Sequence, residues 1–193
     1  MHTKEDIMHY IECKFTVNYV KYYTNVVSDD LCSKLIRENF AYKPSRYATH
    51  DSGARVKDDR VDSKDFWIFK DNTYYQGIKS CYEDVVERYH SDFNLFTAQH
   101  LTDFRVSKYE TGGFMSKHID TIHHSHGQEW GYPQVTALLF LNDDYEGGDI
   151  IIAGKTFHTS VGSALIFPSN FMYPHEVNEI TSGTRYSVTC WLM

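Results

Sequence analysis

Three side chains in the second half of the chain are of the types that bind transition metals. His118 and Asp120 stand two residues apart, and His175 follows far downstream. Successive strand residues point to opposite faces, so a strand over 114–120 would place His118 and Asp120 on one face. Two imidazoles and one carboxylate on one face suit iron(II) and leave coordination positions open for reactants. We therefore predict that His118, Asp120 and His175 are metal ligands and catalytic residues.

Arg185 is the candidate for a fixed cation beside this metal. It follows His175 by ten residues, in a segment whose alternation would place Arg185, Ser187 and Thr189 on one face of a strand. A guanidinium offers a rigid set of donors that suits a carboxylate. We predict that Arg185 binds a carboxylate near the metal. The alternative is a surface charge at a strand edge.

These residues resemble the iron(II)/2-oxoglutarate-dependent dioxygenases, and within them the prolyl 4-hydroxylase-like branch. The branch has Tyr-x-x-Gly, His-x-Asp, Leu-Asn, Gly-Gly, then a His and a basic residue. The matching positions here, in the same order, are Tyr109, Gly112, His118, Asp120, Leu141, Asn142, Gly147, Gly148, His175 and Arg185. The match extends over roughly the last half of the chain, and an ordered set of this kind is more specific than one short motif.

The resemblance implies a function and a set of cofactors. The expected reaction is hydroxylation of prolyl residues at the 4-position in a peptide or protein, with release of succinate and carbon dioxide. The expected cofactors are Fe(II), 2-oxoglutarate as co-substrate and O2, with ascorbate in a supporting role. Two alternatives stay open. One keeps this chemistry but acts on another side chain, a free amino acid or a methylated base, and the other is a non-catalytic metal-binding jelly-roll module.

The resemblance also suggests roles for further residues. Tyr109 matches a tyrosine that helps bind the co-substrate, with a plain core aromatic as the alternative. Thr136 and Ser187 would add hydroxyl donors to the same pocket. Trp191, six residues after the arginine, matches a tryptophan on the substrate side of the iron, although a buried core tryptophan is the competing interpretation. Arg60 is a further candidate for contact with the substrate.

Some positions depart from the family pattern or suggest other sites. Relatives often carry an arginine where this chain has Pro133, and Phe140 replaces a tyrosine that can donate a hydrogen bond. These departures concern the residues that hold the substrate in relatives and leave the candidate metal ligands unchanged. The histidines of 123–126 could form a second metal site, but the polar sequence around them favours a solvent loop. Gly147 and Gly148 indicate a tight turn, since no phosphate-binding signature follows them.

Composition limits the class of protein. The chain has 193 residues, 41% of them hydrophobic, and a formal net charge of −7. This charge gives no general attraction to nucleic acid, and no apolar run approaches the roughly 20 residues that span a bilayer. The four cysteines form no Cys-x-x-Cys pair, so reduced thiols are expected. We predict a soluble, cytoplasmic protein that is a monomer or weak oligomer and binds neither nucleic acid nor membrane.

Hydrophobic patterning predicts helices before strands. Strands are expected within 10–27 and at 66–69, one helix from Ser28 to about Phe40, and a second from an Asn72 cap to Phe93. Further strands are expected at 101–109, 114–120, 134–141, 149–152, 155–158, 163–167, 173–177 and 184–192.

This order of elements predicts an α+β, mainly β fold. We expect one domain over 1–193, with helical support over about 1–100 and a double-stranded β-helix, or jelly roll, over about 101–193. The polar segment 41–65 lacks apolar residues that would anchor it. It could be a solvated loop, or its 55–65 part could be a mobile lid over the substrate.

Overall fold

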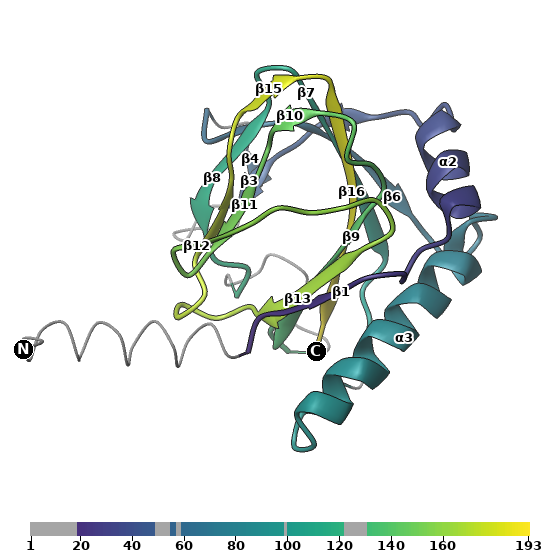
Figure 1. Cartoon of the computed structure of the whole chain (residues 1–193), viewed down its shortest axis with the longest axis vertical. Helices are drawn as coiled ribbons and strands as arrows, with labels where there is room; N and C mark the ends of the chain where they lie inside the picture. Colours follow the sequence, from purple (N-terminus) through teal and green to yellow (C-terminus); the bar gives the residue numbers. More distant parts are fainter. Residues whose placement is uncertain (1–18, 49–54, 57–58, 99, 122–130) are drawn as a thin grey trace, which may run out of the picture.

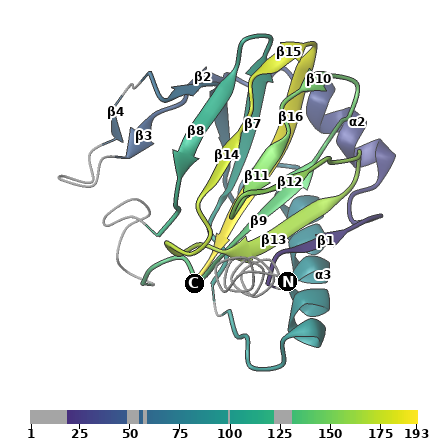
Figure 2. The same ribbon diagram turned by 60° about the vertical axis from the view of Figure 1, so that its left-hand side comes forward.

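Two larger β-sheets face each other, and two helices cover the outer side of one of them (Figures 1 and 2). The computed structural model describes residues 19–48, 55–56, 59–98, 100–121 and 131–193. No helix in these ranges is both long enough and apolar enough to cross a membrane. The predicted α+β, mainly β class is confirmed.

The larger sheet has seven antiparallel strands. From one edge to the other its members are β1 (Lys21–Tyr23), β13 (Ala164–Pro168), β9 (Val135–Phe140), β16 (Thr184–Leu192), β7 (Phe104–Glu110), β6 (Lys64–Ile68) and β2 (Lys43–Pro44). The central strand β16 pairs with β9 on one side and with β7 on the other.

The second sheet has five strands and carries two of the predicted metal ligands. Its order is β12 (Lys155–Phe157), β11 (Ile150–Ile152), β14 (His175–Val177), β8 (Phe114–His118) and β5 (Val61–Asp62). Two small ladders complete the described fold, β10 (Glu146–Gly147) with β15 (Ile180–Ser182), and β3 (Tyr47–Ala48) with β4 (Arg55–Val56).

Helix α2 (Asp29–Arg37) begins where the sequence predicts. The Ser28 side chain accepts a hydrogen bond from the Leu31 backbone N–H at 3.3 Å, and Asp29 and Asp30 lie in the first turn. A side-chain oxygen at this position satisfies a backbone donor that has no partner within the helix, and carboxylates favour the same end.

Helix α3 (Tyr75–Asp92) begins two residues later than an Asn72 cap predicts. Asn72 is not its N-cap: the Asn72 side chain instead accepts from the Tyr74 backbone N–H at 2.9 Å, which stabilises a turn ahead of the helix. Near the middle of the helix, the buried Tyr82 hydroxyl donates to the Val188 carbonyl at 2.8 Å. This bond connects α3 to the central strand of the larger sheet.

The two faces of the larger sheet are buried against different partners. Residues of α3 such as Ile78 and Val85 pack on one face, and the other face packs on Ile150 and Ile152 of the second sheet. All six residues of β9 are buried as a result. Cys32, Cys81 and Cys190 are buried free thiols, which agrees with the predicted reduced state for the cysteines that the structure describes.

The polar segment 41–65 is not a continuous loop. It includes β2 and β5 and the start of β6, and β5 pairs with β8 next to the predicted metal site. Backbone hydrogen bonds hold these short strands, so they need few apolar side chains. Residues 49–54 and 57–58 lie outside the described ranges, as do residues 10–18 of the predicted N-terminal strands.

Candidate functional site

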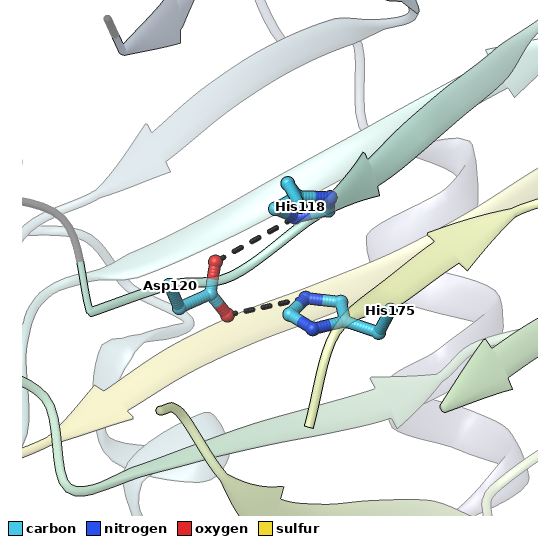
Figure 3. A group of neighbouring side chains, drawn as sticks. All are labelled: His118, Asp120 and His175. Carbon is cyan, nitrogen blue, oxygen red and sulfur yellow. Dashed lines mark ion pairs between the residues drawn. The ribbon is translucent and has the colours of Figure 1, made fainter. Parts of the chain in front are cut away.

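The three predicted metal ligands come together where β8 ends and the neighbouring β14 begins (Figure 3). His118 ends β8 and His175 begins β14, and the two residues are partners across the ladder. Strand β8 stops at His118, so Asp120 lies beyond the strand that the sequence predicts to contain it. The Asp120 backbone N–H donates to the Ser169 carbonyl at 3.2 Å, which fixes the carboxylate opposite the two imidazoles.

The ligand atoms of the group face one another. The Nε2 atom of His118 lies 3.6 Å from one carboxylate oxygen of Asp120, and the Nε2 atom of His175 lies 3.4 Å from the other. Candidate ligand atoms of all three side chains lie within 4.8 Å of one another. A metal ion placed among them would be bound on one face only, because the described group supplies three ligands.

Backbone carbonyls orient both imidazoles. The Nδ1 atom of His118 lies 2.8 Å from the Ser116 carbonyl, and that of His175 lies 3.2 Å from the Tyr173 carbonyl. A carbonyl can only accept, so each Nδ1 carries the hydrogen and each Nε2 keeps its lone pair for a metal.

The charge states of the group suit a divalent cation. Burial lowers the pKa of His118 from 6.5 to about 4, and the neighbouring His175 lowers it further against the opposing effect of Asp120. Burial on its own would raise the pKa of Asp120, but the two histidines and Thr136 hold that pKa well below its ordinary value. At neutral pH the group therefore presents a neutral His118 imidazole and a carboxylate.

Thr136 lines the cavity and contacts the candidate metal ligand Asp120. Its hydroxyl lies 2.6 Å from the second carboxylate oxygen of Asp120 and 2.9 Å from the Ser169 hydroxyl. The carboxylate cannot donate, so the Thr136 hydrogen is directed to Asp120. This contact adds positioning of Asp120 to the predicted role of Thr136, and its role as a co-substrate donor stays a prediction. Sequence reasoning missed Ser169, because no motif marks it.

The Arg185 side chain is buried and lines the cavity beside the candidate metal ligands. It is 1% exposed, which excludes the surface-charge interpretation. Its guanidinium lies 5.2 Å from the Tyr109 ring centre and 5.3 Å from that of Phe140, and one terminal nitrogen donates to the Ser187 hydroxyl at 3.3 Å. Its buried Nε atom has no hydrogen-bond partner within the part of the chain that the structure describes. A buried donor of this kind calls for an acceptor, and a carboxylate would satisfy it.

Arg185 and the metal-binding group line one narrow cavity of ≈ 30 Å³. Its walls are formed by Arg105, Tyr109, Met115, His118, Asp120, Thr136, Leu138, Ile150, His175, Val177, Arg185, Ser187 and Thr189.

The other predicted residues divide into two groups. Tyr109 and Ser187 line the cavity, and burial raises the pKa of Tyr109, so its phenol stays protonated and able to donate. Trp191 and Arg60 do not line it: Trp191 is 2% exposed, and Arg60 is exposed in the turn before β5. The histidines of 123–126 lie outside the described residues.

Arg105 is a cavity residue that sequence reasoning missed. It stands on β7 two positions before Ser107 and four before Tyr109, so strand alternation directs all three to the inner face. That alternation was the signal available in the sequence. Arg105 belongs to none of the motif positions, so motif matching alone could not find it.

Comparison with known proteins agrees with this geometry. Residues 104–193 match the family model described as the 2OG-Fe(II) oxygenase superfamily. The match covers just under half of the chain, and over this range the chain is similar to that superfamily. The matched range includes every candidate metal ligand and cavity residue named above.

Two curated relatives are hydroxylases by name. A PKHD-type hydroxylase of Delftia acidovorans is 34% identical over 95 residues, which cover 45% of this chain and 41% of the relative. Human prolyl 3-hydroxylase 2 is 38% identical over 63 residues, which cover 29% of this chain and 9% of the relative. The chain thus spans less than half the length of the curated relatives that it matches.

A solved structure supports the fold over the whole chain. It is a prolyl hydroxylase from Trichoplax adhaerens in complex with a hypoxia inducible factor peptide fragment. The match has a TM-score of 0.71 at 18% identity and covers 100% of this chain and 94% of the other. At this identity the likeness concerns the fold.

Proposed function

We propose that this protein is an iron(II)- and 2-oxoglutarate-dependent hydroxylase of prolyl residues in a peptide or protein. One observation carries the proposal: three metal ligands and the buried Arg185 line the same cavity. The arrangement provides a cation-binding end and a carboxylate-binding end for one small dicarboxylate. The family match supports the same assignment.

His118, Asp120 and His175 would hold the iron. When bound, iron(II) supplies the coupled oxidation in which O2 converts 2-oxoglutarate to succinate and carbon dioxide and hydroxylates a substrate C–H bond. The two Nε2 lone pairs and the Asp120 carboxylate are the donors, and ascorbate would support the cofactor's reduced state. Thr136 and Ser169 hold Asp120 in place through the hydroxyl contacts described above.

Arg185 would bind the distal carboxylate of 2-oxoglutarate. Its unpartnered Nε supplies one donor, and the protonated Tyr109 phenol and the Ser187 hydroxyl lie in the same cavity. Charge-assisted hydrogen bonds are stronger than neutral ones, so this end of the cavity would orient the co-substrate. Burial of these groups keeps water away from them and increases the strength of the contact.

The proposed substrate atom is C4 of a prolyl residue. The order of the site residues is that of the prolyl 4-hydroxylase-like branch, while one curated relative is named prolyl 3-hydroxylase 2. We also propose that the paired sheets form a double-stranded β-helix within one domain over 1–193. A cytoplasmic location and a monomeric or weakly oligomeric state stay predictions.

A peptide library with and without proline tests this function. The iron-loaded protein should form succinate in step with a mass gain of one oxygen on proline peptides, and fragmentation with authentic standards should place it at C4 rather than C3. Asp120→Ala should abolish both products. Hydroxylation at C3 would correct the position, and hydroxylation only of peptides that lack proline, or of a free amino acid, would overturn the prolyl assignment.

A further inference from the structure

Arg105 lies where the metal cavity meets a second, larger hollow. This groove has a volume of ≈ 770 Å³ and is lined by Ala41, Lys43, Pro44, Ser45, Arg46, Asp65, Phe66, Trp67, Phe69 and Arg105. Arg105 is the one residue that lines both the groove and the metal cavity. It pairs in register with Trp67 of β6 on one side and with Thr189 of β16 on the other. Its side chain therefore stands between the groove and the metal ligands.

The Arg105 guanidinium is held by stacking and keeps a free donor. Its central carbon lies 4.7 Å from the Trp191 ring centre, and Trp191 in turn stacks on Trp67 at 6.1 Å between ring centres. The buried Nε atom of Arg105 has no hydrogen-bond partner among the described residues. Stacking fixes the plane of a guanidinium and leaves its edge available to an acceptor. A substrate oxygen at the mouth of the cavity would supply that acceptor.

The groove is positively charged although the chain is acidic. Lys43 and Arg46 are exposed cations, and the described residues offer no ion-pair partner to either of them. Among the described lining residues, Asp65 is the one carboxylate, and its oxygen accepts from the Ser107 hydroxyl at 3.0 Å. These residues thus bring three cations against one carboxylate, in a chain of net charge −7, which favours an anionic occupant.

The size of the groove favours a peptide over a single amino acid. Its volume lies in the upper part of the range of pockets that hold drug-sized ligands. Its lining includes residues of β2 and β6, which lie at one edge of the seven-stranded sheet, where an extended chain can lie. The half-exposed Phe69 adds an apolar surface to the wall.

We infer that Arg105 is a specificity-determining residue that binds a carboxylate of the substrate, and that the substrate is an extended peptide with Asp or Glu close to the oxidised residue. The inference rests on the proposed hydroxylase function. Arg105 would hold the carboxylate nearest the metal, and Lys43 and Arg46 would attract further acidic residues along the groove. Arg185 would keep the separate task of binding the co-substrate.

Matched peptides test the substrate class without any change to the protein. Three peptides share one central proline and carry Glu, Gln or Lys at the flanking positions. Binding is measured on the full chain loaded with Mn(II) and 2-oxoglutarate, and turnover is measured with iron(II). The Glu peptide should bind about ten- to a hundredfold more tightly than the Gln peptide, which is the range of a charged hydrogen bond, and this advantage should decrease with added salt. Equal affinity for the Glu and Gln peptides would overturn the inference.

Variants of Arg105 test whether this residue binds the substrate carboxylate. Arg105→Gln should raise the dissociation constant of the Glu peptide about ten- to a hundredfold, with little change for the Gln peptide. Iron content and the KM for 2-oxoglutarate should stay at wild-type values. Arg105→Lys should recover part of the preference, because it restores charge without the planar fork. Arg37→Gln is the matched control, since this exposed arginine lies on α2 and does not line the groove.

The outcomes separate this inference from the proposed function. Tight binding of the Glu peptide to the Mn(II) protein, with no hydroxylation by the iron protein, would support Arg105 and refute the hydroxylase proposal. Equal hydroxylation of all three peptides would support the hydroxylase proposal and refute the role of Arg105. A rise in the KM for 2-oxoglutarate in Arg105→Gln, without loss of peptide preference, would assign Arg105 to the co-substrate and overturn the inference.

Discussion

Thr136 fixes one oxygen of the Asp120 carboxylate, and this single contact connects the larger sheet to the metal-binding group. The hydroxyl is buried and lies 2.6 Å from the carboxylate. Thr136→Val removes the hydroxyl with almost no change in volume. Because contacts that orient a metal ligand contribute strongly to affinity, we expect the variant to bind iron(II) or Mn(II) about 10- to 100-fold more weakly. A metal titration of the purified variant measures this directly.

Thr189 provides the control for that substitution. It is also buried and lines the same cavity, and no hydrogen bond joins its hydroxyl to a metal ligand in the described structure. Thr189→Val should therefore retain wild-type metal affinity. Equal weakening in both variants would mean that the loss comes from general disturbance of the cavity and not from the contact with Asp120.

At the scale of residues, the sequence predicts the candidate metal ligands and Arg185 better than it predicts the residues that surround and position them. The types and spacing of His118, Asp120 and His175, followed by a strand-borne Arg185, are enough to predict a group that the structure brings together. Ser169 and Arg105 could not be predicted in the same way. Their importance depends on which backbone or ring lies opposite them, and that is decided by pairing between distant strands.

The turn at Gly147 and Gly148 lies close to the Arg185 side chain. Gly148 has a φ of +65°, and a Cβ there would meet the Ile180 side chain and approach the Arg185 Cδ to 3.3 Å. Gly148→Ala should lower the free energy of unfolding by about 2–4 kcal/mol, from left-handed strain and overpacking together. It should also raise the KM for 2-oxoglutarate, because Arg185 must move. Chemical denaturation and co-substrate saturation measure the two effects.

Gly154 separates the strain from the overpacking. Its φ of +79° is similar, but no atom lies within 4 Å of the position that a Cβ would take. Gly154→Ala should cost only about 1–2 kcal/mol and leave the KM for 2-oxoglutarate unchanged. If the two variants were equally destabilised, the packing of Gly148 against the Arg185 region would have no energetic role.

At the scale of elements, prediction succeeded where apolar residues repeat. Helices α2 and α3 bury residues at helical intervals, and the longer strands β13 and β16 are short apolar runs that are almost entirely buried. Hydrophobic patterning did not predict the short strands β2, β5, β10 and β15. Each of them has only two or three residues, which lie in polar sequence. They exist because a distant strand supplies backbone partners, which local sequence does not encode.

The whole molecule encloses the metal-binding group between two sheets, and this burial makes its stability depend on pH. The pKa of His118 is about 4 in the folded state against an ordinary 6.5, so the unfolded chain binds more protons between these values. The metal-free protein should therefore lose stability as pH falls from about 6.5 to 4, by at most about 1.4 kcal/mol per pH unit from this residue.

Denaturation of the chelator-treated protein across this pH range checks the effect. His118→Gln should show a flatter dependence of unfolding free energy on pH than the wild type, because the titrating imidazole is gone. The pKa of Asp120 is lowered well below its ordinary value of 3.8, so the effect of this carboxylate on stability lies below this pH range. Asp120 therefore does not account for the difference in slope between the wild type and His118→Gln. Identical slopes would show that His118 is protonated equally in the folded and unfolded states.

The most direct test of the account is a titration of 2-oxoglutarate into the full chain with and without metal. If one co-substrate joins the metal to Arg185, binding should be one-to-one with Mn(II) as an inert substitute for iron and much weaker after chelation. Arg185→Gln should weaken the metal-dependent binding about ten- to a hundredfold while metal affinity stays unchanged. Affinity that is the same with metal, without metal and in Arg185→Gln would contradict the account.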